Sequence, residues 1–133
     1  PLLEAYRDLD CYEEVPSTLR ALKERQARVA ILSNGSRDML ARAVRSAGLE
    51  TLVDEVFSAE DCGHYKTAPS VYEMVTTRFR IYPEAVSFQS SNRWDVAGAK
   101  RFGFRTVWIN RAGLPNEYQN YGPAREIGNL TEL

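Results

Sequence analysis

The sequence predicts an α/β fold in which a parallel sheet is flanked by helices. Short apolar segments that suit buried strands alternate with segments whose apolar residues recur at helical spacing. This alternation is typical of βαβ units and therefore of a parallel sheet. Small polar residues follow directly after two of the apolar segments, which is where ligands bind in open α/β sheets.

The N-terminal half predicts two helices and two strands. Pro16 suits the first turn of a helix, and residues 28–32 (RVAIL) form an apolar run that suits a buried strand. Ser36 can cap a second helix, which Gly48 closes. Residues 53–58 (VDEVFS) predict a short second strand.

The C-terminal half repeats this order. Pro69 opens a helix, and residues 85–89 (AVSFQ) predict a strand. Residues 94–102 predict another helix, which Gly103 stops, and residues 106–109 (TVWI) predict a further strand. The remaining C-terminal residues predict a polar loop from Leu114 and a weak final element over 126–133.

Length and composition are those of one ordinary globular domain. The 133 residues are 44% hydrophobic and 26% charged, with a formal net charge of -1. This balance gives no basic excess for binding nucleic acid or an anionic membrane, and no apolar run approaches the roughly 20 residues of a spanning helix. Cys11 and Cys62 lack metal-ligand spacing, so we expect two free thiols in a reducing cytoplasm.

Three polar clusters are predicted to meet at one edge of the sheet. Residues 33–36 (SNGS) lie between a strand and a helix N-terminus, where free N–H groups suit an anion, although a plain N-cap turn explains them equally well. Residues 90–95 (SSNRWD) follow the third predicted strand, and Lys66 precedes the Pro69 helix. Lys66 and Asp95 could pair there, as in a covalent hydrolase that uses a carboxylate nucleophile.

These motifs, in this order, resemble the L-2-haloacid dehalogenases of the haloacid dehalogenase superfamily. The segments ILSNGS, YKTAPSVYE, FQSSNRWDVAGAKRFGF and WINRAGLP carry the resemblance, which runs from about Pro16 to Pro115. It implies a Rossmann-like hydrolase core. It also implies hydrolysis of a small 2-halocarboxylic acid to the inverted 2-hydroxy acid through an aspartyl ester, with no metal and no cofactor. Homodimers are common in the family, so a homodimer is implied for the complete enzyme.

The resemblance also implies a role for each matching residue. Ser33 and Asn34 would bind the substrate carboxylate and help form the halide pocket. Lys66 would pair with the nucleophilic Asp and keep it ionised. Ser90 and Asn92 would hold that nucleophile and the hydrolytic water. Asp95 would pair with Lys66 and activate the water, and Tyr72 would face the site or fill the core. Trp94 would form an aromatic wall beside the halide, with core packing as an equal alternative.

The nucleophile itself does not match any position of the chain. The family places it on an N-terminal strand that ends in D-x-x-G-T. Asp8 and Asp10 lie instead in a polar, helical-looking segment and are not assigned to the role. We expect residues 1–15 to end the helical cap and residues 16–133 to form a partial core that lacks its first central strand. That loss would leave two interior strand edges unpaired.

Further departures lie beside the predicted site. Thr67 and Ala68 stand where relatives often have Pro or an acid, and Arg93 adds a cation near the site. Two other functions stay open: a non-catalytic remnant, and a phosphatase of the same superfamily. Metal-dependent phosphatases usually carry an acidic residue soon after the strand where this chain reads Ser-Ser-Asn. Because fewer carboxylates attract a hard cation less strongly, we predict no bound metal.

Overall fold

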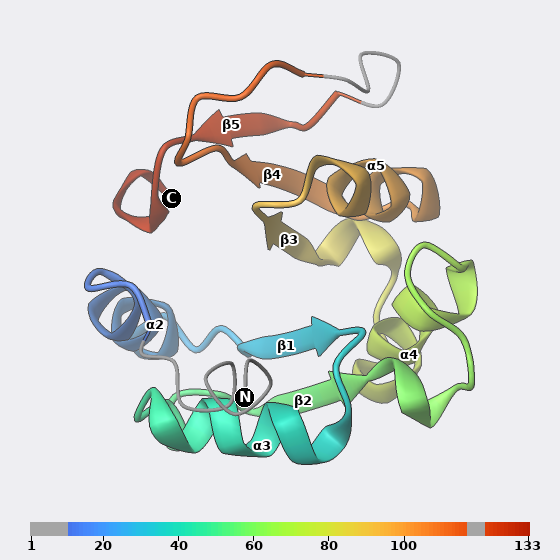
Figure 1. Cartoon of the computed structure of the whole chain (residues 1–133), viewed down its shortest axis with the longest axis horizontal. Coiled ribbons are helices and arrows are strands. Elements are labelled where there is room, and N and C mark those ends of the chain that lie inside the picture. The colour runs from blue at the N-terminus through green and yellow to red at the C-terminus, as the bar shows by residue number, and fades with distance from the viewer. Residues whose placement is uncertain (1–10, 117–121) are drawn as a thin grey trace, which may run out of the picture. The chain divides into compact units, whose positions relative to one another are not determined.

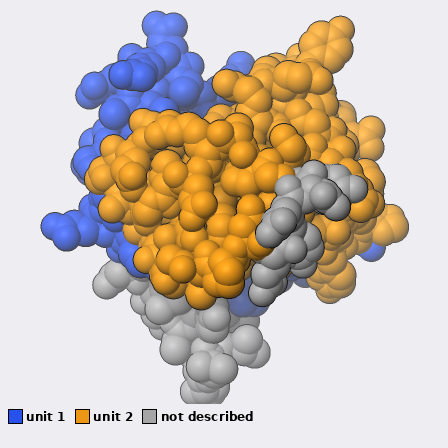
Figure 2. All heavy atoms as spheres, turned by 90° about the horizontal axis from the view of Figure 1, so that it is seen from above, with its two compact units in different colours: residues 1–63 blue, residues 64–133 orange. Residues whose placement is uncertain are grey.

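The computed structural model describes residues 11–116 and 122–133. They fall into two compact units that divide between Gly63 and His64. Figure 2 shows residues 1–63 and residues 64–133 in different colours. Each unit is built around its own small parallel sheet.

Unit 1 contains a two-stranded parallel sheet (Figure 1). β1 pairs with β2 in a register that sets Ser33 opposite Ser58, so both strands end on a serine at the same edge. The elements of this unit, in chain order, are α2 (Val15–Glu24), β1 (Ala30–Ser33), α3 (Arg37–Ser46), β2 (Glu55–Ser58) and the short 3-10 helix η1 (Ala59–Asp61).

The ends of α3 follow from local chemistry. The Ser36 hydroxyl accepts a hydrogen bond from the Met39 N–H at 3.2 Å, which satisfies a backbone donor of the first turn as predicted. Gly48 has a φ of 70°, a left-handed conformation that costs glycine little, and the chain leaves the helix there. The Leu49 N–H then donates to the Val44 carbonyl at 3.0 Å, and both side chains are buried.

Unit 2 contains a three-stranded parallel sheet in the order β3-β4-β5. Helix α4 (Pro69–Phe79) precedes this sheet, and α5 (Arg93–Phe102) connects its first two strands. The remaining elements are η2 (Pro83–Ala85), β3 (Ser87–Ser90), β4 (Arg105–Ile109), β5 (Arg125–Ile127) and η4 (Leu130–Glu132).

Aromatic rings form much of the core of unit 2. Tyr72 of α4 packs against three phenylalanines from β3, the end of α5 and the residue before β4, with ring centroids 5.8 to 6.0 Å apart. Two of these contacts are edge-to-face, a geometry that adds about 0.5–1.5 kcal/mol per pair to the free energy gained by burial. The three partners are Phe88, Phe102 and Phe104.

The predicted order of helices and strands and the parallel pairing are confirmed. Both strands that lead to the predicted polar clusters begin and end slightly later than expected, so Ser33 and Ser90 are their last residues. The weak element expected over 126–133 contains a short strand, β5, which pairs with β4, followed by η4.

Each sheet ends on a strand that the sequence analysis placed beside an absent central strand. Within the residues that the structure describes, β1 pairs with β2 and β3 pairs with β4. The fold is therefore an incomplete Rossmann-like α/β core. Of the helices in the described residues, none combines the length and the apolar character needed to cross a bilayer.

Candidate active site

The centre of the candidate site in unit 2 is the carboxylate of Asp95. Asp95 lies in the first turn of α5, and its N–H donates to the carbonyl of the N-cap residue Asn92 at 3.0 Å. The residue is only 2% exposed, so its charge is removed from water. A buried carboxylate must be compensated by donors or by an opposite charge.

Lys66 supplies that opposite charge. Its ammonium Nζ lies 2.6 Å from Oδ2 of Asp95, and its side chain is 8% exposed. Nζ also lies 5.3 Å from the centre of the Phe88 ring, within cation–π range. Lys66 belongs to the turn that leads into α4, so this pair connects that turn to the start of α5. The predicted pairing of Lys66 with Asp95 is present.

Tyr72 donates a second hydrogen bond to the same carboxylate. Its hydroxyl lies 2.8 Å from Oδ1 of Asp95, and the residue is completely buried. Burial, followed by the negative charge of Asp95 and the hydrogen bond to it, raises the pKa of the Tyr72 phenol far above its usual range. The phenol therefore stays a protonated donor. Tyr72 fills the core and contacts Asp95, and its place beside the substrate stays a prediction.

Ser90 provides the third donor. Its hydroxyl lies 3.3 Å from Oδ2 of Asp95 and accepts a hydrogen bond from the Asn92 N–H at 3.1 Å. Asp95 thus receives hydrogen bonds from Lys66, Tyr72 and Ser90. These bonds join the turn before α4, α4 itself and the end of β3 to one carboxylate.

The other two predicted residues of this turn lie on the surface of the unit. Asn92 is exposed and serves as the N-cap of α5 through its backbone carbonyl. Trp94 is 41% exposed, which does not fit the core-packing alternative. The buried tryptophan is Trp108, which donates its indole N–H to the Ser91 carbonyl at 3.2 Å. The role of Trp94 as an aromatic wall stays a prediction.

Ser33 and Asn34 belong to unit 1, where the turn after β1 is held by serine hydroxyls. Ser33 accepts a hydrogen bond from the Gly35 N–H at 3.0 Å. Asn34, the residue between these two in the sequence, is partly buried. Ser58 at the end of β2 is completely buried and donates to the Gly35 carbonyl at 2.7 Å. This geometry includes the plain capped turn considered above, and the role of Ser33 and Asn34 in binding substrate stays a prediction.

Two features near the site were not predicted from the sequence: the buried Ser58 and the contacts that hold Arg93. The sequence pattern could have indicated Ser58, because it ends a strand as Ser33 and Ser90 do. In all three cases the serine hydroxyl accepts a hydrogen bond from the backbone N–H two residues later. Arg93 is 7% exposed, and its Nε donates to the Asn116 side chain at 2.7 Å while the guanidinium lies 5.8 Å from the Trp108 ring centre. Nothing in the sequence pattern indicated those contacts.

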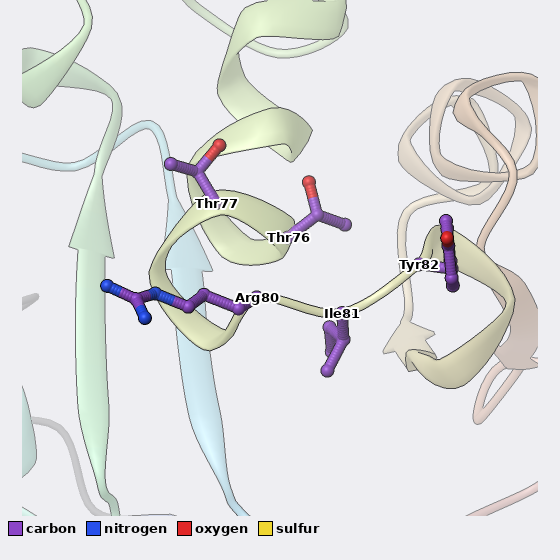
Figure 3. A pocket seen from close by; sticks show the side chains of 5 residues that line it. All are labelled: Thr76, Thr77, Arg80, Ile81 and Tyr82. Carbon is purple, nitrogen blue, oxygen red and sulfur yellow. The ribbon is translucent and has the colours of Figure 1, made fainter.

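The hollow drawn in Figure 3 lies away from this carboxylate network. It is formed by the last turn of α4 and the residues after it, namely Thr76, Thr77, Arg80, Ile81 and Tyr82. None of the predicted site residues lines it. Within the described parts of the chain, no group of three or more His, Cys, Asp or Glu side chains could hold a metal ion. The expected absence of a metal stays a prediction.

The family of the chain follows from a comparison over most of its length. The sequence model of the haloacid dehalogenase-like hydrolases matches residues 2–103. The chain belongs to this family. The (S)-2-haloacid dehalogenase 4A of Burkholderia cepacia is 41% identical over 132 residues, which cover 99% of this chain and 57% of that protein. The chain thus spans a little more than half the length of this dehalogenase.

Solved structures of two family members show the same fold. The L-2-haloacid dehalogenase of Xanthobacter autotrophicus, with chloropropionic acid covalently bound, is 29% identical with a TM-score of 0.85, over 97% of this chain and 61% of that one. A haloacid dehalogenase-family phosphatase from Thermococcus onnurineus is 27% identical with a TM-score of 0.86, over 98% of this chain and 60% of that one. The fold is therefore common to relatives with different reactions.

Proposed function

We propose that the whole protein is an (S)-2-haloacid dehalogenase, which hydrolyses small L-2-haloalkanoic acids to 2-hydroxy acids. The observation that carries this proposal is the buried Lys66–Asp95 pair beside the Ser-Ser-Asn end of β3. A relative of which 132 residues align at 41% identity bears that enzyme name. The proposed reaction acts on a carbon–halogen bond and uses neither a metal nor another cofactor.

In the proposed reaction, an aspartate carboxylate attacks C2, halide leaves, and water hydrolyses the resulting ester. The attacking aspartate has no assigned position in the 133 residues, so the proposal requires that the whole protein supply it. Asp8 and Asp10 lie outside the described residues. We propose that this chain supplies the groups around the nucleophile. The proposed division into a cap segment, residues 1–15, and a core, residues 16–133, belongs to the same hypothesis.

The described contacts support distinct roles for Lys66 and Asp95. The Lys66 ammonium is held away from water, where its charge favours a nearby ionised carboxylate more strongly than it would in solvent. Asp95 fixes the position of that ammonium, and we propose that its carboxylate also helps to activate the hydrolytic water. Holding reacting groups in place in this way is a large part of catalysis.

The remaining roles follow the same proposal. Ser33 and Asn34 bind the substrate carboxylate, and Trp94 lines the halide side of the pocket. Ser90 and Asn92 position the nucleophile and water, with Ser90 already held by Asp95. Tyr72 would face the site through its hydrogen bond to the Asp95 carboxylate. We also propose that the enzyme acts in the cytoplasm, where its two free cysteines stay reduced, and that the complete enzyme is a homodimer.

Halide release from L-2-chloropropionate by the full-length gene product tests the proposal. We expect release with the L enantiomer, loss of release in Asp95→Asn, and unchanged release in Asp54→Asn, which alters an aspartate of the other unit. Release of phosphate from small phosphoesters in the presence of Mg²⁺, without halide release, would contradict the proposal. It would favour the second candidate, a phosphatase like the Thermococcus onnurineus protein of similar fold.

A further inference from the structure

Gly98 lies on α5 one turn after Asp95, on the same side of the helix. A Cβ atom at this position would lie 2.6 Å from Cγ2 and 2.8 Å from Cβ of Thr67, and 2.7 Å from the Tyr72 hydroxyl oxygen. Ordinary contacts with a Cβ begin at 3.4 Å. The position therefore has no room for any side chain, and the residues it would strike adjoin or belong to the Asp95 network.

Neither neighbour can withdraw easily. The Thr67 Cβ is bonded directly to the backbone, so it moves only if the turn that carries Lys66 moves with it. The Tyr72 ring is packed against Phe88, Phe102 and Phe104, which prevents its hydroxyl from retreating. A Cβ at residue 98 would thus push α5 away from the turn that carries Lys66 and from Tyr72 of α4. These two residues are the ones that contact Asp95 from that side.

We propose that Gly98 is a positioning residue: its bare Cα lets the Lys66–Thr67 turn and the Tyr72 hydroxyl approach α5 closely enough to hold Asp95. The required separation is about 0.6 to 0.8 Å, the difference between the three short contacts and an ordinary one. Lys66 and Tyr72 bond Asp95 at 2.6 and 2.8 Å, so a shift of that size breaks or distorts both bonds. This inference rests on the proposed function for its effect on activity, but its structural content is independent of it.

Helix propensity points in the opposite direction from this role. Glycine inside a helix is less favourable than alanine. If residue 98 had no other role, Gly98→Ala would therefore stabilise α5. Gly128 provides a matched control in the same unit. The nearest atom to a Cβ at Gly128 is the terminal Oε2 of Glu132 at 3.1 Å, which needs to shift by only a few tenths of an ångström. This oxygen accepts the N–H groups of Gly128 and Asn129, so any cost of the control stays at the C-terminal turn, which none of the residues around Asp95 belongs to.

The experiment compares Gly98→Ala, Gly128→Ala and the double variant Gly98→Ala/Thr67→Gly in the full-length protein. The first readout is the ammonium signal of ¹⁵N-labelled lysine, observed by NMR. These 133 residues contain three lysines, of which Lys23 and Lys100 are more exposed than Lys66. In the full-length protein the Lys66 signal is assigned as the one that a Lys66→Met variant lacks. We expect a protected Lys66 signal in the wild type and in Gly128→Ala, and loss of it in Gly98→Ala. The double variant should recover the signal only in part, because Thr67→Gly removes two of the three short contacts and leaves the one with the Tyr72 hydroxyl.

The second readout is halide release, for which we expect a loss of about 10- to 100-fold in kcat for Gly98→Ala and partial recovery in the double variant. An unchanged Lys66 signal in Gly98→Ala would overturn the inference, and so would an equal loss of the signal in Gly128→Ala. If the wild type releases no halide but the Lys66 signal behaves as expected, the inference holds and the proposed function fails.

Discussion

Each unit of the molecule contains a lysine–aspartate pair, and the two pairs differ in their contact with water. The side chains of Lys66 and Asp95 in unit 2 are 8% and 2% exposed, whereas those of Lys23 and Asp54 in unit 1 are 33% and 32% exposed. Exposed ion pairs contribute little to stability, while buried pairs carry a desolvation cost that is tolerable only when both charges remain.

The partners of the two aspartates explain this difference. Asp54 also accepts the Val29 N–H at 2.8 Å, so it joins the segment before β1 to the segment before β2. Asp95 instead accepts hydrogen bonds from three side chains at the carboxyl end of β3 and the start of two helices. A costly buried pair at the ligand-binding end of a sheet is more characteristic of a functional site than of a structural tie.

Breaking the buried pair should have the largest effect. In Asp95→Asn the Lys66 ammonium stays buried but loses the charge that offsets it, so we expect unit 2 to lose about 3–5 kcal/mol of stability. Urea unfolding followed by tryptophan fluorescence measures this directly, because both tryptophans, Trp94 and Trp108, lie in unit 2. A loss below about 1 kcal/mol would mean that the pair behaves like an exposed one.

Removing the Tyr72 hydroxyl should have the next largest effect. Tyr72→Phe deletes a buried hydrogen bond to an ionised group, which contributes about 1.5–3 kcal/mol. The ring and its aromatic contacts remain, so the loss reports the hydroxyl alone. Tyr82→Phe is the matched control, since Tyr82 is 81% exposed. Equal stability of the two variants in urea would show that the Tyr72–Asp95 bond contributes nothing.

Alkaline pH should also affect unit 2 through Tyr72. The pKa of this phenol is raised in the folded chain, so the folded state keeps a proton that the unfolded state releases above about pH 10. The contribution is fully present below pH 10 and declines by up to about 1.4 kcal/mol per pH unit above it. Urea midpoints between pH 8 and 11 should show this decline in the wild type and a smaller one in Tyr72→Phe.

The exposed pair of unit 1 should give the smallest effect. We expect Asp54→Asn to cost about 0.2–1 kcal/mol, measured by amide hydrogen exchange in β1, with the fluorescence transition of unit 2 unchanged. The hydrogen bond from Lys23 and then that from Val29 hold the pKa of Asp54 below its usual range. Its contribution is therefore present above about pH 4 and disappears as the pH falls through the lowered folded value.

The pH dependence separates Asp54 from other acidic groups. In Asp54→Asn, exchange in β1 should lose the part of its acid sensitivity that Asp54 causes. A variant that keeps the full wild-type sensitivity between pH 5 and 2 would show that the Lys23–Asp54 pair is not formed in solution.

The sequence predicted those features that depend on neighbours along the chain. Alternating apolar segments gave the parallel strands, and the Ser36 cap and the glycine at position 48 marked the ends of α3. The meeting of Lys66 with Asp95 could also be predicted, because strand ends of a parallel sheet share an edge and the motifs resemble a known family.

The features that the sequence did not predict depend on tertiary packing. β5 contains a single buried residue, Ile127, and its polar neighbours hide the strand pattern. Trp94 of α5 lies on the surface and Trp108 of β4 lies in the core, a difference that depends on how α5 and the sheet pack together. The demand for glycine at residue 98 arises only from the approach of Thr67 and Tyr72, which lie about thirty residues earlier.

The aromatic packing around Tyr72 couples substitutions in the core to substitutions in the site. Its phenol is held in position by three phenylalanine rings, of which Phe88 also lies 5.3 Å from the Lys66 ammonium, while Phe102 and Phe104 contact the Tyr72 ring. A change of ring size at Phe102 or Phe104 would therefore select for a compensating change near Tyr72. Across relatives we expect these three positions to vary together, so that the evolution of an apolar core and of a charged site is recorded in the same substitutions.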